Sequence, residues 1–208
     1  MPQKPELDAL VATLQKHPAG KRIIVAIAGA PGSGKSTIAR KLIKRLNTPT
    51  LARAGLLEMD GYHYDNRVLR QLGRLHHKGA PDTFDVNGLI HTLDRLQKNC
   101  VGTVAVPVFD RSIETARAGA RLIPSSQDII IVEGNYLLLD YPGWNRLAAF
   151  FDITVMIRTP PRILRARLIQ RWHNLGYGNE ETQRKVEEND LPNGQTVINH
   201  STPADFTL

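Results

Sequence analysis

Cysteine, aromatic residues and long apolar runs are scarce in this sequence. Cys100 is the single cysteine among 208 residues, which excludes an intrachain disulfide and a metal site built from several cysteines and favours a reducing compartment. No apolar run approaches the roughly 20 residues of a membrane span, and residues 1–20 lack the apolar core of a signal peptide. We therefore expect a cytoplasmic protein without a membrane partner, and the length suits one domain over residues 1–208.

The charge of the chain is unbalanced toward lysine and arginine. These two types number 27 against 20 aspartates and glutamates, which gives a formal net charge of +7. A basic chain can bind nucleic acid, a membrane surface or small phosphorylated molecules. Because aromatic residues make up only 6% and offer no evident platform for stacking single-stranded bases, nucleic acid is not the partner we expect.

Strand-length apolar runs alternate with helical patterns along the chain. Apolar runs predict strands at 23–28, 56–59, 129–132 and 153–157, and weaker signals add 103–109 and 197–198. Apolar residues at helical spacing predict helices at 6–16, 38–46 and 86–98, and a long helix after Pro160-Pro161. Buried strands separated by helices are typical of a three-layer α/β/α domain with a mostly parallel sheet.

A glycine-rich segment lies between the first predicted strand and the following helix. It shows the spacing of a phosphate-binding loop: Gly, four residues, Gly-Lys, then Ser. Its residues are Gly29, Ala30, Pro31, Gly32, Ser33, Gly34, Lys35 and Ser36, with Thr37 next. Glycines let backbone N–H groups turn inward as an anion nest, and the helix N-terminus adds its positive dipole. Lys35 can reach the β and γ phosphates and the Ser36 hydroxyl can hold Mg²⁺, so we expect ATP and Mg²⁺ here rather than a plain turn with a surface lysine.

Acidic residues follow two of the predicted strands. Asp60 and Glu133 stand at strand ends, the edge where an open α/β sheet binds ligands. A carboxylate near the γ-phosphate can accept the proton of an attacking hydroxyl. We expect this role for Asp60, and a simple Asp60-Gly61 turn is the alternative. Glu133 is either a Mg²⁺ ligand, together with Ser36 and Asp60, or an ordinary strand-end acid.

Two polar loops supply candidates for contacts with a second ligand. His63 and Tyr64 follow Asp60 closely, although either can serve in packing alone. The loop at 78–85 contains Asp82, which suits hydrogen bonding to a hydroxylated molecule. Asp85 in the same loop can equally cap the helix that begins near residue 86.

Arginine recurs without acidic neighbours from residue 158 to residue 171. A solvated basic face is the usual interpretation of such a run. At about 100° per residue, however, Arg165 falls within the apolar arc of the helix and Arg162 lies beside it, whereas Arg167 and Arg171 point elsewhere. Because an unpaired buried charge is costly, we expect Arg162 and Arg165 to bind the phosphates of ATP from a lid helix within residues 160–190.

Together these motifs resemble the uridine kinase, phosphoribulokinase and bacterial pantothenate kinase group of P-loop kinases. Besides the phosphate loop, the likeness rests on residues 60–66 (Asp-Gly-Tyr-His-Tyr-Asp-Asn), 78–85 (Lys-Gly-Ala-Pro-Asp-Thr-Phe-Asp), 106–110 (Val-Pro-Val-Phe-Asp), Glu133-Gly134 and the arginine-rich helix. The resemblance covers about residues 23–197. It implies a five-stranded parallel core, with site roles for Asp60 (general base), Ser36 and Glu133 (Mg²⁺), Asp82 (acceptor), and Arg162 and Arg165 (phosphates).

Within this group the chain looks most similar to bacterial kinases associated with sugar (fructose) transport. The uridine kinases usually have a tyrosine in their Pro-x-Tyr-Asp stretch and a histidine soon afterwards. Here Phe109 replaces the tyrosine and residues 113–115 supply no histidine. These departures disfavour a uridine-specific pocket and leave Phe109 as a candidate contact of another acceptor.

The sequence predicts an enzyme that transfers the γ-phosphate of ATP to a hydroxyl of a small polar metabolite, such as a sugar, a nucleoside or a pantothenate-like alcohol. One alternative is a slow ATPase that senses a metabolite for a transporter or regulator. Another, prompted by the net charge, is a nucleic-acid-binding ATPase. Formation of a phosphorylated product distinguishes the first from the other two. Both a monomer and a homodimer are compatible with the sequence.

Overall fold

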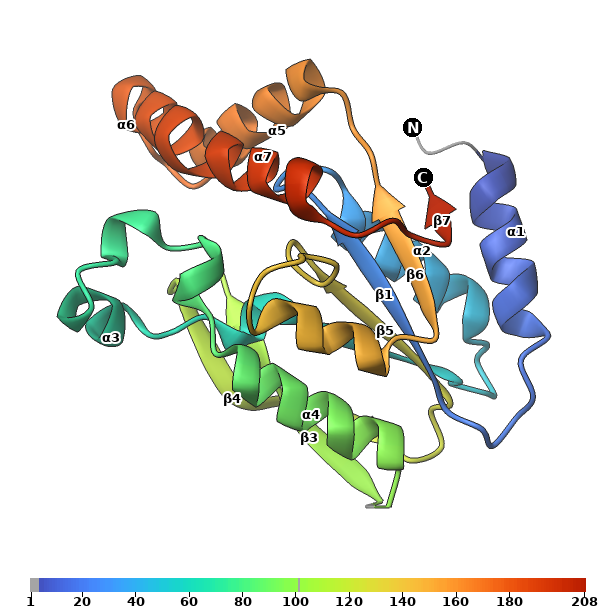
Figure 1. Cartoon of the computed structure of the whole chain (residues 1–208). Coiled ribbons are helices and arrows are strands. Elements are labelled where there is room, and N and C mark those ends of the chain that lie inside the picture. Colours follow the sequence, from blue (N-terminus) through green and yellow to red (C-terminus); the bar gives the residue numbers. More distant parts are fainter. Residues whose placement is uncertain (1–3, 101) are drawn as a thin grey trace.

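A five-stranded parallel sheet forms the centre of the computed structural model, which describes residues 4–100 and 102–208 (Figure 1). The strands run in the order β2-β5-β1-β6-β7, and all neighbours are parallel. Their bounds are β1 Ile23–Gly29, β2 Ala54–Glu58, β5 Ile129–Gly134, β6 Ile153–Ile157 and β7 Phe206–Thr207. β2 and β5 lie on one side of β1, and β6 and β7 lie on the other, so the carboxyl end of β1 is the switch point at which such sheets bind ligands.

Helices cover both faces of the sheet and complete a three-layer α/β/α domain. Helices α1 and α2 pack on one face, and α4 and the 3₁₀ helix η4 pack on the other (Figure 1). Their bounds are α1 Lys4–Gln15, α2 Lys35–Leu46, α4 Val86–Lys98 and η4 Trp144–Phe150. Val25 and Ile27 of β1 join the first core, whereas Ile24 and Ala26 join the second. Burial on both faces explains why the strands read as continuous apolar runs.

Three further parts surround the carboxyl edge of the sheet. The chain after β2 forms short helices: η1 Met59–Tyr62, α3 Asn66–Gln71, η2 Leu75–His77 and η3 Pro81–Thr83. An antiparallel hairpin is formed by β3 Thr103–Asp110 and β4 Thr115–Pro124. The C-terminal helical segment comprises α5 Pro161–Asn174, α6 Asn179–Lys185, the π-helical turn η5 Val186–Asp190 and α7 Leu191–His200. Figure 1 shows this segment above the end of the sheet that carries the phosphate loop.

The predicted fold class is confirmed, and one predicted strand is wrong. Val197 and Ile198 lie in α7, and the last strand is β7 instead. Val197 is buried in the core between α7 and the sheet, so its apolar character reflects a helix face rather than a strand. The strand β4 was not predicted because half of its residues are exposed and only Ile123 is buried, which weakens the apolar pattern. Within the described residues, no helix combines the length and apolarity needed to cross a membrane.

Candidate active site

A large cavity opens at the carboxyl edge of the sheet. It has a volume of about 1740 Å³ and is lined by the phosphate loop, by residues that follow β2, by the tip of the β3–β4 hairpin and by the C-terminal helical segment. A single drug-sized ligand usually occupies about 300–1,000 Å³. The cavity therefore has room for two ligands side by side.

The phosphate loop connects β1 to α2 at one end of this cavity. Gly32 and Gly34 have φ angles of 77° and 95°, a left-handed conformation in which a side chain would be strained. This backbone path and the N-terminus of α2 form the anion cradle that the motif predicts. The Ser33 hydroxyl is buried without a hydrogen-bond partner, and Lys35 begins α2. Burial lowers the pKa of Lys35 more than the charges of Glu133 and Asp60 raise it, so the net shift is downward. The residues present thus fit a nucleotide phosphate chain.

Ser36 and Glu133 meet beside the phosphate loop. The Ser36 hydroxyl donates a hydrogen bond to Glu133 Oε1 at 3.0 Å. Glu133 is only 5% exposed, and burial raises its pKa to about 7 although Lys35 lowers it. In the residues that the structure describes, no three His, Cys, Asp or Glu side chains cluster as a metal site. Proteins often bind Mg²⁺ through one or two carboxylates plus substrate phosphates, so the buried Glu133 carboxylate beside Ser36 and the phosphate loop suits this ion.

Glu133→Gln is expected to raise the stability of the nucleotide-free protein at pH 8 but hardly at pH 4. The pKa of Glu133 is raised from 4.5 to about 7 in the fold. The contribution of Glu133 to the free energy of unfolding is therefore fully present below pH 4.5 and is lost as the pH rises through 7. A neutral glutamine avoids that loss. Thermal unfolding at both pH values measures the effect, and a variant less stable than the wild type at pH 8 contradicts it.

Asp60 lies in η1, directly after β2, and lines the cavity. Arg111 Nη2 donates to Asp60 Oδ2 at 2.6 Å. Burial raises the pKa of Asp60, but His63, Arg111 and Lys35 outweigh burial and hold the pKa at about 2. Burial also lowers the pKa of His63, so its ring is neutral at pH 7 and Arg111 and Lys35 provide the lasting positive charge. Asp60 is therefore an ionised carboxylate that faces the phosphate loop.

The acceptor candidates from the sequence divide into two groups. His63 and Phe109 line the cavity, and their ring centroids are 4.8 Å apart. Tyr64 and Asp82 lie outside the lining, which corrects the expectation that they contact the acceptor. Asp82 is 57% exposed and pairs with Arg74 at 2.8 Å, and a tight 3₁₀ turn directs it toward the surface.

Asp85 serves the structural role that the sequence left open. Its carboxylate accepts a hydrogen bond from the Gly88 N–H at 2.8 Å. It therefore caps α4 at the N-terminus.

Arg162 and Arg165 of α5 lie away from the cavity, contrary to the prediction. Arg165 pairs with Glu187 at 2.7 Å and also bonds Gln183, and Arg162 is exposed. Neither residue lines the cavity. Acceptors on the neighbouring α6–η5 helix satisfy Arg165, and the sequence of α5 alone gives no sign of them.

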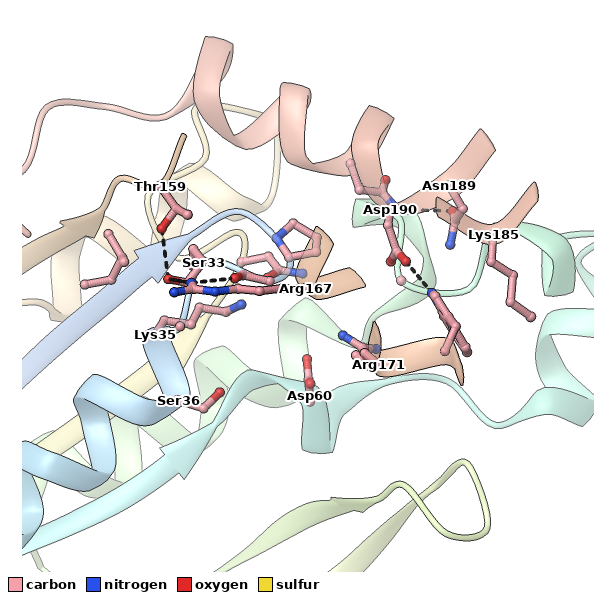
Figure 2. A pocket seen from close by; sticks show the side chains of 18 of the residues that line it. Ser33, Lys35, Ser36, Asp60, Thr159, Arg167, Arg171, Lys185, Asn189 and Asp190 are labelled. Carbon is pink, nitrogen blue, oxygen red and sulfur yellow. Dashed lines mark hydrogen bonds between the residues drawn. The ribbon is translucent and has the colours of Figure 1, made fainter. Parts of the chain in front are cut away.

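Arg167 and Arg171 line the cavity instead. Arg167 Nη1 donates to the carbonyl oxygens of Gly32 and Ser33, both at 3.1 Å. The Arg171 guanidinium lies 5.3 Å from the Trp172 ring, and its Nε is buried without a partner. Figure 2 shows Arg167 alongside the phosphate loop and Arg171 on the side of Asp60. Their spacing of four residues, which places side chains on one helix face, was the available sequence signal.

Several cavity residues carried no sequence signal. The π-helical turn ends with Asn189 and Asp190, which line the cavity (Figure 2). Asn189 Nδ2 donates to the Lys78 carbonyl at 2.9 Å. Asp190 is 7% exposed and accepts a hydrogen bond from Trp172 Nε1 at 2.6 Å. The Asn189–Lys78 contact joins the C-terminal helical segment to the loop at 75–79, beside a π-helical turn of the kind often found at functional sites.

A family model described as the phosphoribulokinase / uridine kinase family matches residues 24–181. The chain belongs to this family. The resemblance noted in the sequence is thereby confirmed, and the chain is a P-loop kinase of a small metabolite. The family implies ATP and Mg²⁺ as phosphate donor and metal ion, in keeping with the phosphate loop and the Ser36–Glu133 pair.

Individual relatives differ in the substrates that their names give. A solved structure from Silicibacter sp. TM1040, named "putative fructose transport system kinase", has 38% identity and a TM-score of 0.87 over 97% of this chain and 98% of its own. A "putative uridine kinase" of Schizosaccharomyces pombe is 31% identical over 98% of this chain and 88% of its own. A pantothenate kinase of Enterococcus faecalis is 32% identical over 74% of this chain and 49% of its own. These names do not agree on one acceptor for this kinase.

Proposed function

We propose that the kinase transfers the γ-phosphate of ATP to a hydroxyl of a small polar metabolite, of the sugar, nucleoside or pantothenate-like type. One observation carries this proposal: a single cavity is lined by both the phosphate loop and an ionised Asp60, and its volume has room for a second ligand. In-line transfer requires donor and acceptor to meet at the reacting phosphate within one site.

The donor half of the proposed site is built from residues on the sheet and α2. ATP phosphates would lie in the cradle of residues 29–37, with Lys35 beside them. Ser36 and Glu133 would hold Mg²⁺, which supplies charge neutralisation on the phosphates. Arg167 and Arg171 take the role that the sequence predicted for Arg162 and Arg165. Charged donors that are already in place stabilise developing charge without reorganising during the reaction.

Asp60 is the proposed general base. The acceptor oxygen forms a bond to the γ-phosphorus, the bond between that phosphorus and the bridging oxygen of ADP breaks, and the hydroxyl proton passes to the Asp60 carboxylate. His63 and Phe109 border the space beside Asp60, so they are proposed acceptor contacts. The C-terminal helical segment, expected as a lid at about 160–190, covers the phosphate loop within one domain.

Arg171→Gln is expected to lower kcat by about 10²-fold or more, because it removes a charged donor aimed at the reacting phosphate. Arg165→Gln on the same helix is the matched control. Arg165 forms an exposed pair with Glu187, and such pairs contribute about 1 kcal/mol or less, so kcat should stay near wild type. Steady-state turnover of both variants measures the contrast. Equal losses, or a larger loss in Arg165→Gln, would reject this arrangement of the arginines.

A panel of alcohols tests the proposed function. The purified protein is incubated with ATP and Mg²⁺ and with sugars, nucleosides or pantothenate-like compounds, and ADP and phosphorylated product are quantified together. The expected result is one phosphorylated acceptor for each ADP. ADP release without any phosphorylated product would instead support the metabolite-sensing ATPase.

A further inference from the structure

Two cations gather at the Phe109 ring in the acceptor half of the cavity. Lys78 Nζ lies 5.0 Å from the ring centroid, and the Arg111 guanidinium carbon lies 5.6 Å from it. The two residues come from different loops, Lys78 from the turn after η2 and Arg111 from the tip of the β3–β4 hairpin. Both line the cavity together with Asp60 and His63. The positive charge of Arg111 is therefore placed beside the proposed base.

Arg111 is paired with Asp60 at 2.6 Å, whereas burial lowers the pKa of Lys78 more than the carboxylates of Glu114 and Asp65 raise it. Lys78 Nζ donates to the Asn66 side-chain oxygen at 2.7 Å and to the Glu114 backbone carbonyl at 2.6 Å, both of which are uncharged acceptors. Among the described residues, no carboxylate lies within 4.0 Å of Lys78. The Glu114 carboxylate borders the same region but forms no ion pair with it. Arg171 adds a third cation, whose Nε has no partner.

Two of the acidic groups that line the cavity are already engaged by other protein groups. Asp60 binds Arg111, and Asp190 accepts the Trp172 indole proton. Glu181 and Glu188 belong to the exposed side of the α6–η5 helix. An anion on the ligand would balance Lys78 and Arg111, as Arg and Lys commonly do for carboxylates and phosphates.

The ion pair between Asp60 and Arg111 connects the positive charge of Arg111 to the proposed general base. A hydroxyl that is to lose its proton must hydrogen-bond the Asp60 carboxylate, and Arg111 holds Oδ2 of that carboxylate at 2.6 Å. A ligand anion competes with Asp60 for Arg111 and makes Oδ2 available to the hydroxyl. A neutral alcohol offers Arg111 no such alternative partner.

We propose that the phosphate acceptor carries an anionic group, a carboxylate or a phosphate, that Lys78 and Arg111 bind beside Asp60. Arg111 is then a specificity-determining residue, because it binds the charged group directly beside the carboxylate that takes the proton. This inference rests on the proposed function, since it describes the acceptor of that same site. It separates acids and sugar phosphates from unmodified sugars and nucleosides.

Calorimetric binding of matched pairs of compounds tests the proposal. The protein is first saturated with Mg²⁺ and a non-hydrolysable ATP analogue. It is then titrated with glycerol and glycerate, with pantothenol and pantothenate, and with ribulose and ribulose 5-phosphate. We expect at least one charged member to bind about tenfold or more tightly than its neutral counterpart. The acid pairs and the sugar-phosphate pair distinguish a carboxylate from a phosphate as the recognised group.

Variants of the same hairpin assign the effect to Arg111. Arg111→Gln is expected to abolish the preference for the charged member. Arg117→Gln is the control, because Arg117 is 63% exposed, pairs with Asp110 at 3.3 Å and lies outside the cavity lining; it should keep the preference. Thermal unfolding of both variants verifies that they fold.

The outcomes are separable from those of the kinase assay. Equal binding of neutral and charged members, no binding of any charged member, or a preference that persists in Arg111→Gln overturns the anionic acceptor. Because this binding is measured without turnover, a failure to form phosphorylated product would count against the proposed function alone.

Discussion

Asp60→Asn is expected to lower kcat by about 10²-fold or more while the protein still binds ATP nearly as tightly as the wild type. General-base catalysis contributes about this much, and asparagine keeps the shape of the side chain without its capacity to take a proton. The nucleotide cradle is formed by other residues, at 29–37. Single-turnover transfer to the acceptor, combined with equilibrium binding of ATP, separates the two effects.

Asp82→Asn is the matched control for this experiment. Asp82 belongs to the loop that follows the same strand, but it pairs with Arg74 at the surface. The same chemical change there should leave turnover close to that of the wild type. If Asp60→Asn transferred phosphate as fast as the wild type, Asp60 would not be the base. If the two variants lost activity equally, the effect would be structural rather than chemical.

Lys35→Ala is expected to weaken nucleotide binding and to reduce transfer by about 10²-fold or more, the usual cost of removing a charged donor from the reacting phosphate. Lys35 also acts on two acids, because its positive charge lowers the pKa of both Asp60 and Glu133. Its loss should therefore raise the pKa of Glu133 further. ATP titration and the pH dependence of thermal unfolding report these two consequences.

Lys44→Ala on the same helix provides the comparison for Lys35→Ala. Lys44 is exposed and lies outside the main cavity, so both its ATP affinity and its activity should remain near wild type. Wild-type ATP affinity in Lys35→Ala would reject the phosphate loop as the nucleotide site.

The donor half of the site was predictable because it is local in the sequence. The phosphate loop needs one strand, one turn and one helix N-terminus, and a contiguous motif encodes all three. Asp60 and Glu133 were predictable for a related reason: strand ends of a parallel sheet share one edge. In the structure, Ser36 and Glu133 are hydrogen-bonded although 97 residues separate them in the chain.

The arginines of α5 and the acceptor half were less predictable because contacts between distant segments decide them. Arg165 faces Glu187 rather than the cavity, and nothing in the periodicity of α5 reveals the helix beside it. Arg111 reaches Asp60 from a hairpin tip 51 residues away, where no periodic pattern exists. Asp82 resembled an acceptor contact in its loop, yet a short 3₁₀ turn directs it to Arg74.

The β3–β4 hairpin pairs only with itself and is not a member of the main sheet. The residues proposed to bind ATP sit on the phosphate loop, the main sheet, α2 and α5, whereas Arg111 and Phe109 sit on the hairpin. Loops borne on a rigid scaffold tolerate change more readily than the elements that carry them. Substitutions at the hairpin tip can thus change which metabolite is accepted while the residues proposed to bind ATP stay unchanged. One scaffold could in this way diversify into kinases of different metabolites through few mutations.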